Sequence, residues 1–512
     1  MNLLKALATI SSMTLLSRIM GFLRDMVIAR TFGASFYTDA FLVAFKLPNL
    51  LRRLFAEGAF SQAFVPILAE YKTRRGHAAT RELVDHISAW LGLALFLVTL
   101  AGVAAAPFLV YVSAPGFAAD PQKFHLTVHL LRITFPYILF ISLVSLAGGI
   151  LNTYSKFSVP AFTPVLMNLS FIACALWLAP YFHPPVLALA LAVLLGGVLQ
   201  LAFQIPFLLR LKLLPRFKLT FGDAGVWRIL RLMGPAAFGV SISQISLLIN
   251  TIFASFLVTG SVSWLYFADR LMEFPTGLLG VALGTILLPS LSKHYTDNAP
   301  EAYSELLDWG LRLTLLLALP AAAALAILAV PLITTLFFRG AFTAHDVWMT
   351  RNALVAYSIG LLGLILIKVL APGFYARQNI KTPVKIALFT LAATQVMNLA
   401  FIWPLKHAGL ALAISLGACI NAGLLFYHLR RHHIYRPQPG WTIFLLKILG
   451  GLLVMSLALW LTMGDQSHWL HTSFGYRLGH LLLLVFLGAG SYFLTLAAFG
   501  LRFRHFIQHG AE

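Results

Sequence analysis

The sequence predicts an all-α membrane protein with two six-helix lobes and a C-terminal helix pair, fourteen transmembrane helices in all. Hydrophobic residues make up 60% of the chain and charged residues only 11%, with a mean hydropathy of +0.86. An ordinary soluble domain carries about 25% charged residues. The apolar runs are long and do not alternate every second residue, which disfavours a transmembrane β-barrel.

The apolar runs between polar segments place the spans in order along the chain. The first is expected to be retained in the protein, because Lys5 precedes it but no small-residue cleavage site follows. The spans are expected near residues 8–30, 36–65, 87–112, 126–151, 159–180, 186–209, 232–257, 263–290, 305–330, 350–373, 384–404, 408–429, 441–463 and 476–500.

Basic residues gather in alternate loops, and this asymmetry predicts the topology. One side carries Lys72, Arg74, Arg75, Arg81, Lys156, Arg210, Lys212, Arg216, Lys218, Lys293, Arg377, Lys381, Lys385, Arg430, Arg431 and Arg436. The opposite loops offer only Lys123, Arg339, Lys406 and Arg477. By the positive-inside rule the rich side is cytoplasmic, so both termini are expected in the cytoplasm. The same asymmetry explains much of the net charge of +20 without a nucleic-acid partner.

An internal repeat relates the two halves of the chain. Residues 64–71, FVPILAEY, resemble residues 287–295, LLPSLSKHY, and Met167-Asn168 has a counterpart in Met397-Asn398. The copies lie about 220 residues and six spans apart, so they point the same way, as parallel repeats of transporters do. We therefore divide the chain into an N-lobe of spans 1–6 (1–220), a C-lobe of spans 7–12 (221–436) and a helix pair of spans 13–14 (437–512).

Ionisable residues are unusually dense between Ser17 and Glu57. Charged groups at membrane depth are costly and generally face a protein interior or an aqueous cavity. Arg18 lies about 15 Å from either end of its span, deeper than a snorkelling side chain reaches. Two structural alternatives remain open: Arg18 and Asp25 share a helix face and can form a buried pair, and Arg24, Asp25 and Arg30 can lie at the membrane interface.

The second span and its repeat carry a matching set of charges. Arg52 and Arg53 point about 100° apart, so at most one of them is expected to face a central cavity. Glu57 can pair with Arg53 at i, i+4, and Pro48 is expected to kink the helix. The corresponding span of the C-lobe contains Asp269, Arg270 and Glu273.

These residue types point to an anionic substrate. Arginine stays charged in a low-dielectric cavity, and its planar fork matches phosphate oxygens. We therefore expect substrate binding, in particular of a pyrophosphate head group, by Arg18, Arg24, Arg52 and Arg270. The acids are poor phosphate ligands and are assigned to ion-pair gates: Asp25, Asp39, Glu57, Asp269 and Glu273.

No enzymatic constellation emerges from the sequence. It contains no GxxxxGK[ST] loop, no HExxH motif and no cluster of aspartates. Cys174 and Cys419 fall within apolar spans without metal-ligand spacing and are assigned to packing. We expect neither a catalytic site nor a metal or cofactor.

Several segments resemble the MurJ (MviN) family of lipid II flippases, within the multidrug/oligosaccharidyl-lipid/polysaccharide exporter superfamily. They are SSMTLLSRIMGFLRD at 11–25, the run at 38–71, ADRLMEFP at 268–275, KVLAPGFYARQNIKTPVK at 368–385 and PLKHAGLALAIS at 404–415. The resemblance implies two lobes around a cationic cavity, with a groove for a polyprenyl tail at the last two spans. The family's essential positions are matched by Arg18, Arg24, Asp39, Arg52 and Arg270.

The resemblance implies alternating-access transport of undecaprenyl-pyrophosphate-linked disaccharide-peptide, lipid II, to the outer leaflet of the bacterial inner membrane. The expected partners are lipid II, membrane lipids and, as a further candidate, the cell-wall synthesis machinery, and a monomer is expected. The alternatives are an enzyme that modifies polyprenyl-linked sugars, a multidrug antiporter, and a structural scaffold. An antiporter for cations should line its cavity with acids, and a scaffold does not explain buried charge. The sequence leaves the energy source open between membrane potential, protons and sodium.

Overall fold

The computed structural model of the protein describes residues 3–54 and 60–501. Over these ranges the regular secondary structure is entirely helical, which confirms the predicted fold class. The chain forms two compact units, Met1–Ser263 and Trp264–Glu512. Helix α10 (Ala224–Ser255) packs against α3, α4 and α5 and so belongs to the first unit. The division into lobes at residue 220 concerns the sequence repeat and stays a prediction.

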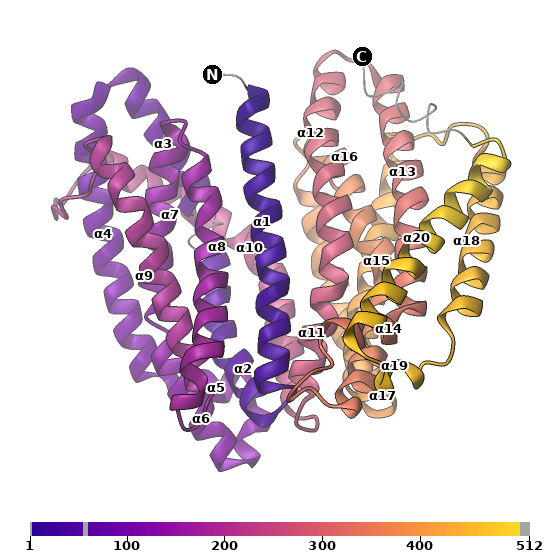
Figure 1. Ribbon diagram of the computed structural model, residues 1–512. Coiled ribbons are helices and arrows are strands. Elements are labelled where there is room, and N and C mark those ends of the chain that lie inside the picture. The colour runs from indigo at the N-terminus through magenta and orange to yellow at the C-terminus, as the bar shows by residue number, and fades with distance from the viewer. Residues whose placement is uncertain (1–2, 55–59, 502–512) are drawn as a thin grey trace. The chain divides into compact units, whose positions relative to one another are not determined.

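The first unit contains the helices of predicted spans 1–7 (Figure 1). Helix α1 packs against α8, α2 packs against α6, and α9 packs against α7 and α8. Several predicted spans are built from two shorter helices in sequence. Besides α10, the helices are α1 (Leu3–Phe32), α2 (Phe36–Leu51), α3 (Ser61–Arg74), α4 (Gly76–Ala104), α5 (Ala106–Ser113), η2 (Pro115–Ala119), α6 (Pro121–Thr134), α7 (Tyr137–Thr153), α8 (Ser158–Ala173), η3 (Cys174–Leu178), η4 (Ala179–Tyr181) and α9 (Leu187–Arg210).

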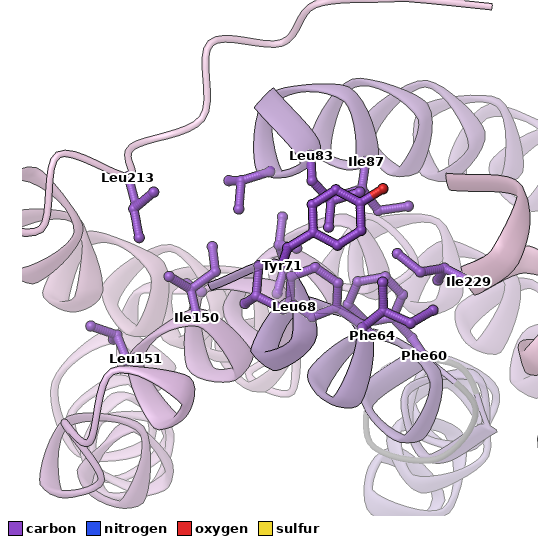
Figure 2. Packing of buried hydrophobic residues seen from close by; sticks show 14 of the residues in the cluster. Phe60, Phe64, Leu68, Tyr71, Leu83, Ile87, Ile150, Leu151, Leu213 and Ile229 are labelled. Atoms are coloured by element: carbon purple, nitrogen blue, oxygen red, sulfur yellow. The ribbon is translucent and has the colours of Figure 1, made fainter. Parts of the chain in front are cut away.

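The core of the first unit is organised around one face of α3. Phe60 and Phe64 stack with ring centroids 5.0 Å apart, and Leu68 and Tyr71 continue the same stripe at helical spacing (Figure 2). Side chains of α4, α7 and α10 close over this stripe, among them Leu83, Ile87, Ile150, Leu151 and Ile229. Burial of this cluster fixes α3 within the unit.

The second unit contains the remaining spans. Helix α11 begins at the end of the first unit and continues into the second. Helix α18 coincides with predicted span 441–463. The helices are α11 (Ser261–Pro275), η5 (Thr276–Gly280), α12 (Val281–Thr296), α13 (Pro300–Ile327), α14 (Ala329–Leu336), α15 (Ala344–Leu370), α16 (Pro372–Tyr375), α17 (Lys381–Arg431), α18 (Trp441–Met463), α19 (His468–His471) and α20 (Phe474–Ala498).

Helix α17 holds two predicted spans joined by a sharp break. Lys406 has a left-handed backbone with φ of 52°, which separates residues 384–404 from residues 408–429. Gly409 is required beside the break, because a Cβ atom there would overlap the carbonyl oxygen of Phe401. Within the described ranges, nine helical segments are long and apolar enough to cross a membrane, and α17 is counted once among them. The chain is therefore a multi-pass membrane protein.

The second and eighth spans, which the repeat pairs, share an irregular segment. Residues 52–54 after α2 are π-helical, and so is η5 after α11. Pro48 lies inside α2, and its ring removes a backbone donor shortly before the first π-helical segment. Single π-helical turns within helices are frequent at functional sites. Both segments lie close to arginines assigned to substrate binding.

Candidate functional site

Arg24 is held by its own helix and by α8. Its Nε and Nη2 atoms lie 2.9 and 2.8 Å from Oδ1 of the buried Asp25, and Nη1 donates to Oδ1 of Asn168 at 3.1 Å. Asn168 in turn donates to the carbonyl of Ser17 at 3.1 Å. The guanidinium also lies 5.6 Å from the ring centroid of Phe171. These contacts orient a half-buried cation between α1 and α8.

Arg18 lies in the same helix and is also half-buried. Within the described part of the chain its guanidinium has no ion-pair partner. Asp25 pairs with Arg24, so the alternative of an Arg18–Asp25 pair is not found. Arg18 therefore carries a positive charge that no acid among the described residues neutralises by direct contact.

Arg52 lies at the start of the first π-helical segment. Its Nε and Nη2 atoms both donate to Oδ1 of Asn49, at 3.0 and 2.8 Å. Arg52 and Arg53 are both half-buried. Glu57 lies outside the described residues, so its pairing with Arg53 stays a prediction.

Arg270 and Glu273 form an ion pair on α11 in the second unit. The Nη1–Oε2 distance is 2.6 Å, and the side chains are 28% and 51% exposed. The guanidinium also lies over the ring of Tyr266, 5.0 Å from its centroid. The neighbouring Asp269 is half-buried. Because Glu273 is 51% exposed, an anion from the aqueous phase can displace its carboxylate from Arg270.

Asp39 is a buried carboxylate that accepts four hydrogen bonds. Its Oδ2 accepts from Lys123 Nζ at 3.0 Å and from the Gly260 backbone N–H at 2.7 Å. Its Oδ1 accepts from the Ser263 backbone N–H at 3.0 Å and from Ser263 Oγ at 2.6 Å. The carboxylate is 1% exposed and lies in the first turn of α2, where the helix dipole favours an anion. It joins α2 to α6 and to the beginning of α11.

Lys123 was not predicted as a site residue, although it completes the Asp39 cluster. It is 5% exposed, with Nζ 4.3 Å from the ring centroid of Phe117 and 3.4 Å from Oγ1 of Thr259. Its sequence signal is a single lysine in a loop on the side that is poor in basic residues. Asn168 was also missed as a partner of Arg24, although its recurrence in the Met-Asn repeat marked it.

The fold and these side chains together define a class of protein. A multi-pass α-helical chain that keeps arginines half-buried in two units has the features of a membrane transporter for an anionic substrate. Among the described residues no group of three or more metal-ligating side chains is present.

The family follows from the sequence. The profile of the family described as lipid II flippase MurJ matches residues 28–478, and the chain belongs to this family. It is 52% identical over 519 aligned positions to a protein of Burkholderia cenocepacia named lipid II flippase MurJ, with 99% of each chain covered. A protein of Haemophilus influenzae named probable lipid II flippase MurJ is 44% identical, with 97% of this chain and 99% of the relative covered.

Solved structures agree with the family assignment. A lipid II flippase MurJ in an inward closed conformation superimposes with a TM-score of 0.81 at 26% identity, covering 97% of this chain and 99% of that one. An inward-facing multidrug transporter of the MATE family gives a TM-score of 0.68 at 15% identity over 83% of this chain. The second likeness concerns the fold alone.

Proposed function

We propose that the protein moves lipid II, the undecaprenyl-pyrophosphate-linked disaccharide-peptide, from the cytoplasmic to the outer leaflet of the bacterial inner membrane. The observation that carries the proposal is the full-length match, at 52% identity, to a relative named lipid II flippase. The half-buried arginines of both units support it, since a pyrophosphate needs fixed cations in a site shielded from water.

The first unit offers Arg18, Arg24 and Arg52 to the head group, and the second unit offers Arg270. Arg24 pairs with Asp25 at 2.8 Å, and Arg270 pairs with Glu273 at 2.6 Å. A pyrophosphate offers its own negatively charged oxygens to these arginines, so binding exchanges an internal ion pair for contacts to the substrate. Asp25 and Glu273 keep these arginines oriented when no substrate is bound. Together with Asp269 they are assigned to ion-pair gates.

The Asp39 cluster acts as a gate on the side opposite the basic loops. Hydrogen bonds to charged groups contribute about 1.5–3 kcal/mol each, so a carboxylate with four donors holds its partners firmly. The substrate site opens by alternating access when these partners separate. Glu57 is assigned to a second gate with Arg53.

The proposed protein is a transporter that leaves its substrate chemically unchanged. The polyprenyl tail stays in the membrane, along the helix pair of residues 437–512, while the head group crosses. Both termini lie in the cytoplasm, and the protein works as a monomer that exchanges lipid II with the cell-wall synthesis machinery.

The test measures lipid II at the outer surface of intact cells that depend on this protein alone. An externally added enzyme that cleaves lipid II reports the amount translocated. Arg24→Ala and Arg270→Ala are expected to abolish translocation at normal protein levels, whereas Arg210→Ala, a change at an exposed arginine ending α9, should leave it unchanged. Normal translocation by both site variants would refute the site.

The enzyme alternative is decided with purified protein. Lipid II incubated with the protein in vesicles is expected to be recovered intact. Release of phosphate, or transfer of the sugar-peptide to another molecule, would show that the chain is an enzyme of polyprenyl-linked sugars.

A further inference from the structure

A groove of about 580 Å³ lies in the second unit between α13, α15, α17 and α18. Its lining is mostly apolar and includes six leucines from these helices together with Phe426. Helix α18 packs against α13 and α20, and the groove separates it from α15 and α17. An occupant of the groove would therefore connect the C-terminal helix pair to the rest of the unit.

Tyr435 and Trp441 also line the groove, and their polar atoms are bonded to Asp308. Tyr435 Oη and Trp441 Nε1 both donate to Oδ1 of the buried Asp308, at 2.6 and 2.7 Å. Asp308 also accepts from the backbone N–H of Gln438 at 3.1 Å and from Nε of Arg312 at 2.7 Å. This bonding fixes the two rings as an apolar wall before any ligand arrives.

Two glycines line the groove, Gly363 and Gly423, and close helix packing explains the glycine only at Gly363. A Cβ atom on Gly363 would lie 2.7 Å from the backbone of Ala418 and Cys419, so close packing of α15 on α17 requires glycine there. A Cβ atom on Gly423 would meet no atom within 4 Å. Glycine in a helix interior costs about 1 kcal/mol relative to alanine, and no contact with a described residue accounts for Gly423. The open space in front of Gly423 is the groove itself.

Charge marks one end of the groove. Arg430 lines it, is exposed, and belongs to the basic segment before α18 that the positive-inside rule assigns to the cytoplasm. The cytoplasmic leaflet carries anionic lipids, and basic pockets between transmembrane helices on this side bind their head groups. The groove beyond Arg430 offers apolar surface of the kind that lipid chains cover.

We propose that this groove binds an acyl chain of an anionic diacyl phospholipid, with the head-group phosphate at Arg430. The lipid is a resident of the second unit and not the transported substrate, whose head group is assigned to arginines on other helices. By filling the space beside Gly423, its chain packs α18 against α15 and α17.

The test measures phospholipid retained by the purified full-length protein, using native mass spectrometry with phosphatidylglycerol or phosphatidylethanolamine of identical acyl chains. The unmodified protein is expected to retain one phosphatidylglycerol, with about tenfold preference over phosphatidylethanolamine from the Arg430 charge. Gly423→Leu fills the groove and should lose the bound lipid. Arg430→Gln should keep a lipid but lose the preference. Gly479→Leu is the matched control, since that exposed α20 glycine also has open space and lies outside the groove.

Three results would overturn the proposal. The first is equal retention by Gly423→Leu and the unmodified protein, with circular dichroism confirming a folded variant. The second is equal retention of the two phospholipids by the unmodified protein. The third is displacement of phosphatidylglycerol by undecaprenyl pyrophosphate at equal concentration, which would assign the groove to the tail of the substrate. Arg430→Gln keeps the proposal testable if the leucine variant does not fold.

Discussion

Lys123→Met is expected to destabilise the first unit by about 3–5 kcal/mol, because it leaves the buried Asp39 carboxylate without its cation. Both side chains are almost fully buried, at 6% and 1% exposed, so water does not replace the lost charge. The hydrogen bonds from Gly260 and Ser263 remain but do not neutralise the carboxylate. The double variant Asp39→Leu/Lys123→Met removes both charges. Its free energy of unfolding should lie within about 1 kcal/mol of that of the unmodified protein, or above it.

The assay is denaturant unfolding of the purified protein in detergent, followed by tryptophan fluorescence, with the four proteins of the cycle measured in parallel. Lys156→Met is the control, because Lys156 is an exposed lysine in a loop of the same unit. The free energy of unfolding of this control is expected to stay within about 0.5 kcal/mol of that of the unmodified protein.

The reasoning fails if the effects of Asp39→Leu and Lys123→Met simply add in the double variant. Additivity would mean that the two residues are energetically independent, whatever the distance between them. A loss below about 1 kcal/mol for Lys123→Met would likewise show that the pair is solvated, as surface ion pairs are.

Three further outcomes are expected. Asn168→Ala removes the α8 partner of Arg24 and should slow lipid II translocation about tenfold at normal protein level; an unchanged rate would show that α8 does not orient the arginine. Gly409→Ala forces a methyl group against the Phe401 carbonyl and should cost about 1–3 kcal/mol in the same unfolding assay. Burial raises the pKa of Asp223, but hydrogen bonds from a histidine and two backbone N–H groups outweigh it and lower the pKa below 3.8. The ionised Asp223 therefore stabilises the fold above pH 3.8, and this contribution is lost as the pH falls through the lowered pKa. The difference in free energy of unfolding between the unmodified protein and Asp223→Asn should shrink on acidification.

The span pattern was accessible from the sequence because each helix buries its apolar residues in a membrane or a core. The agreement is closest at α18, whose ends at Trp441 and Met463 match the prediction. The points where a span divides into two helices were harder to predict from the sequence. Only packing decides whether a proline such as Pro136, just before α7, bends a helix or ends it.

The candidate site was predictable in its charges and not in its partners. Membrane depth singles out Arg18, and the density of charge in apolar spans singles out Arg24, Asp39 and Arg270. Their contacts depend on residues far along the chain: Asn168 is 144 positions from Arg24, and Ser263 is 224 positions from Asp39. Such pairings are set by tertiary packing and cannot be predicted from the spacing of residues along the sequence.

The π-helical segments after α2 and α11 give these two spans a rotational freedom that an α-helix lacks. A π-helical turn holds one residue more than an α-helical turn, so its formation or loss turns the following helix by about 100° relative to the preceding one. In the first unit the two sides of the segment are anchored differently, α2 by Asp39 and α3 by its aromatic face. Movement of the π-helical turn along the span would swing Arg52 around the helix axis relative to the aromatic face of α3.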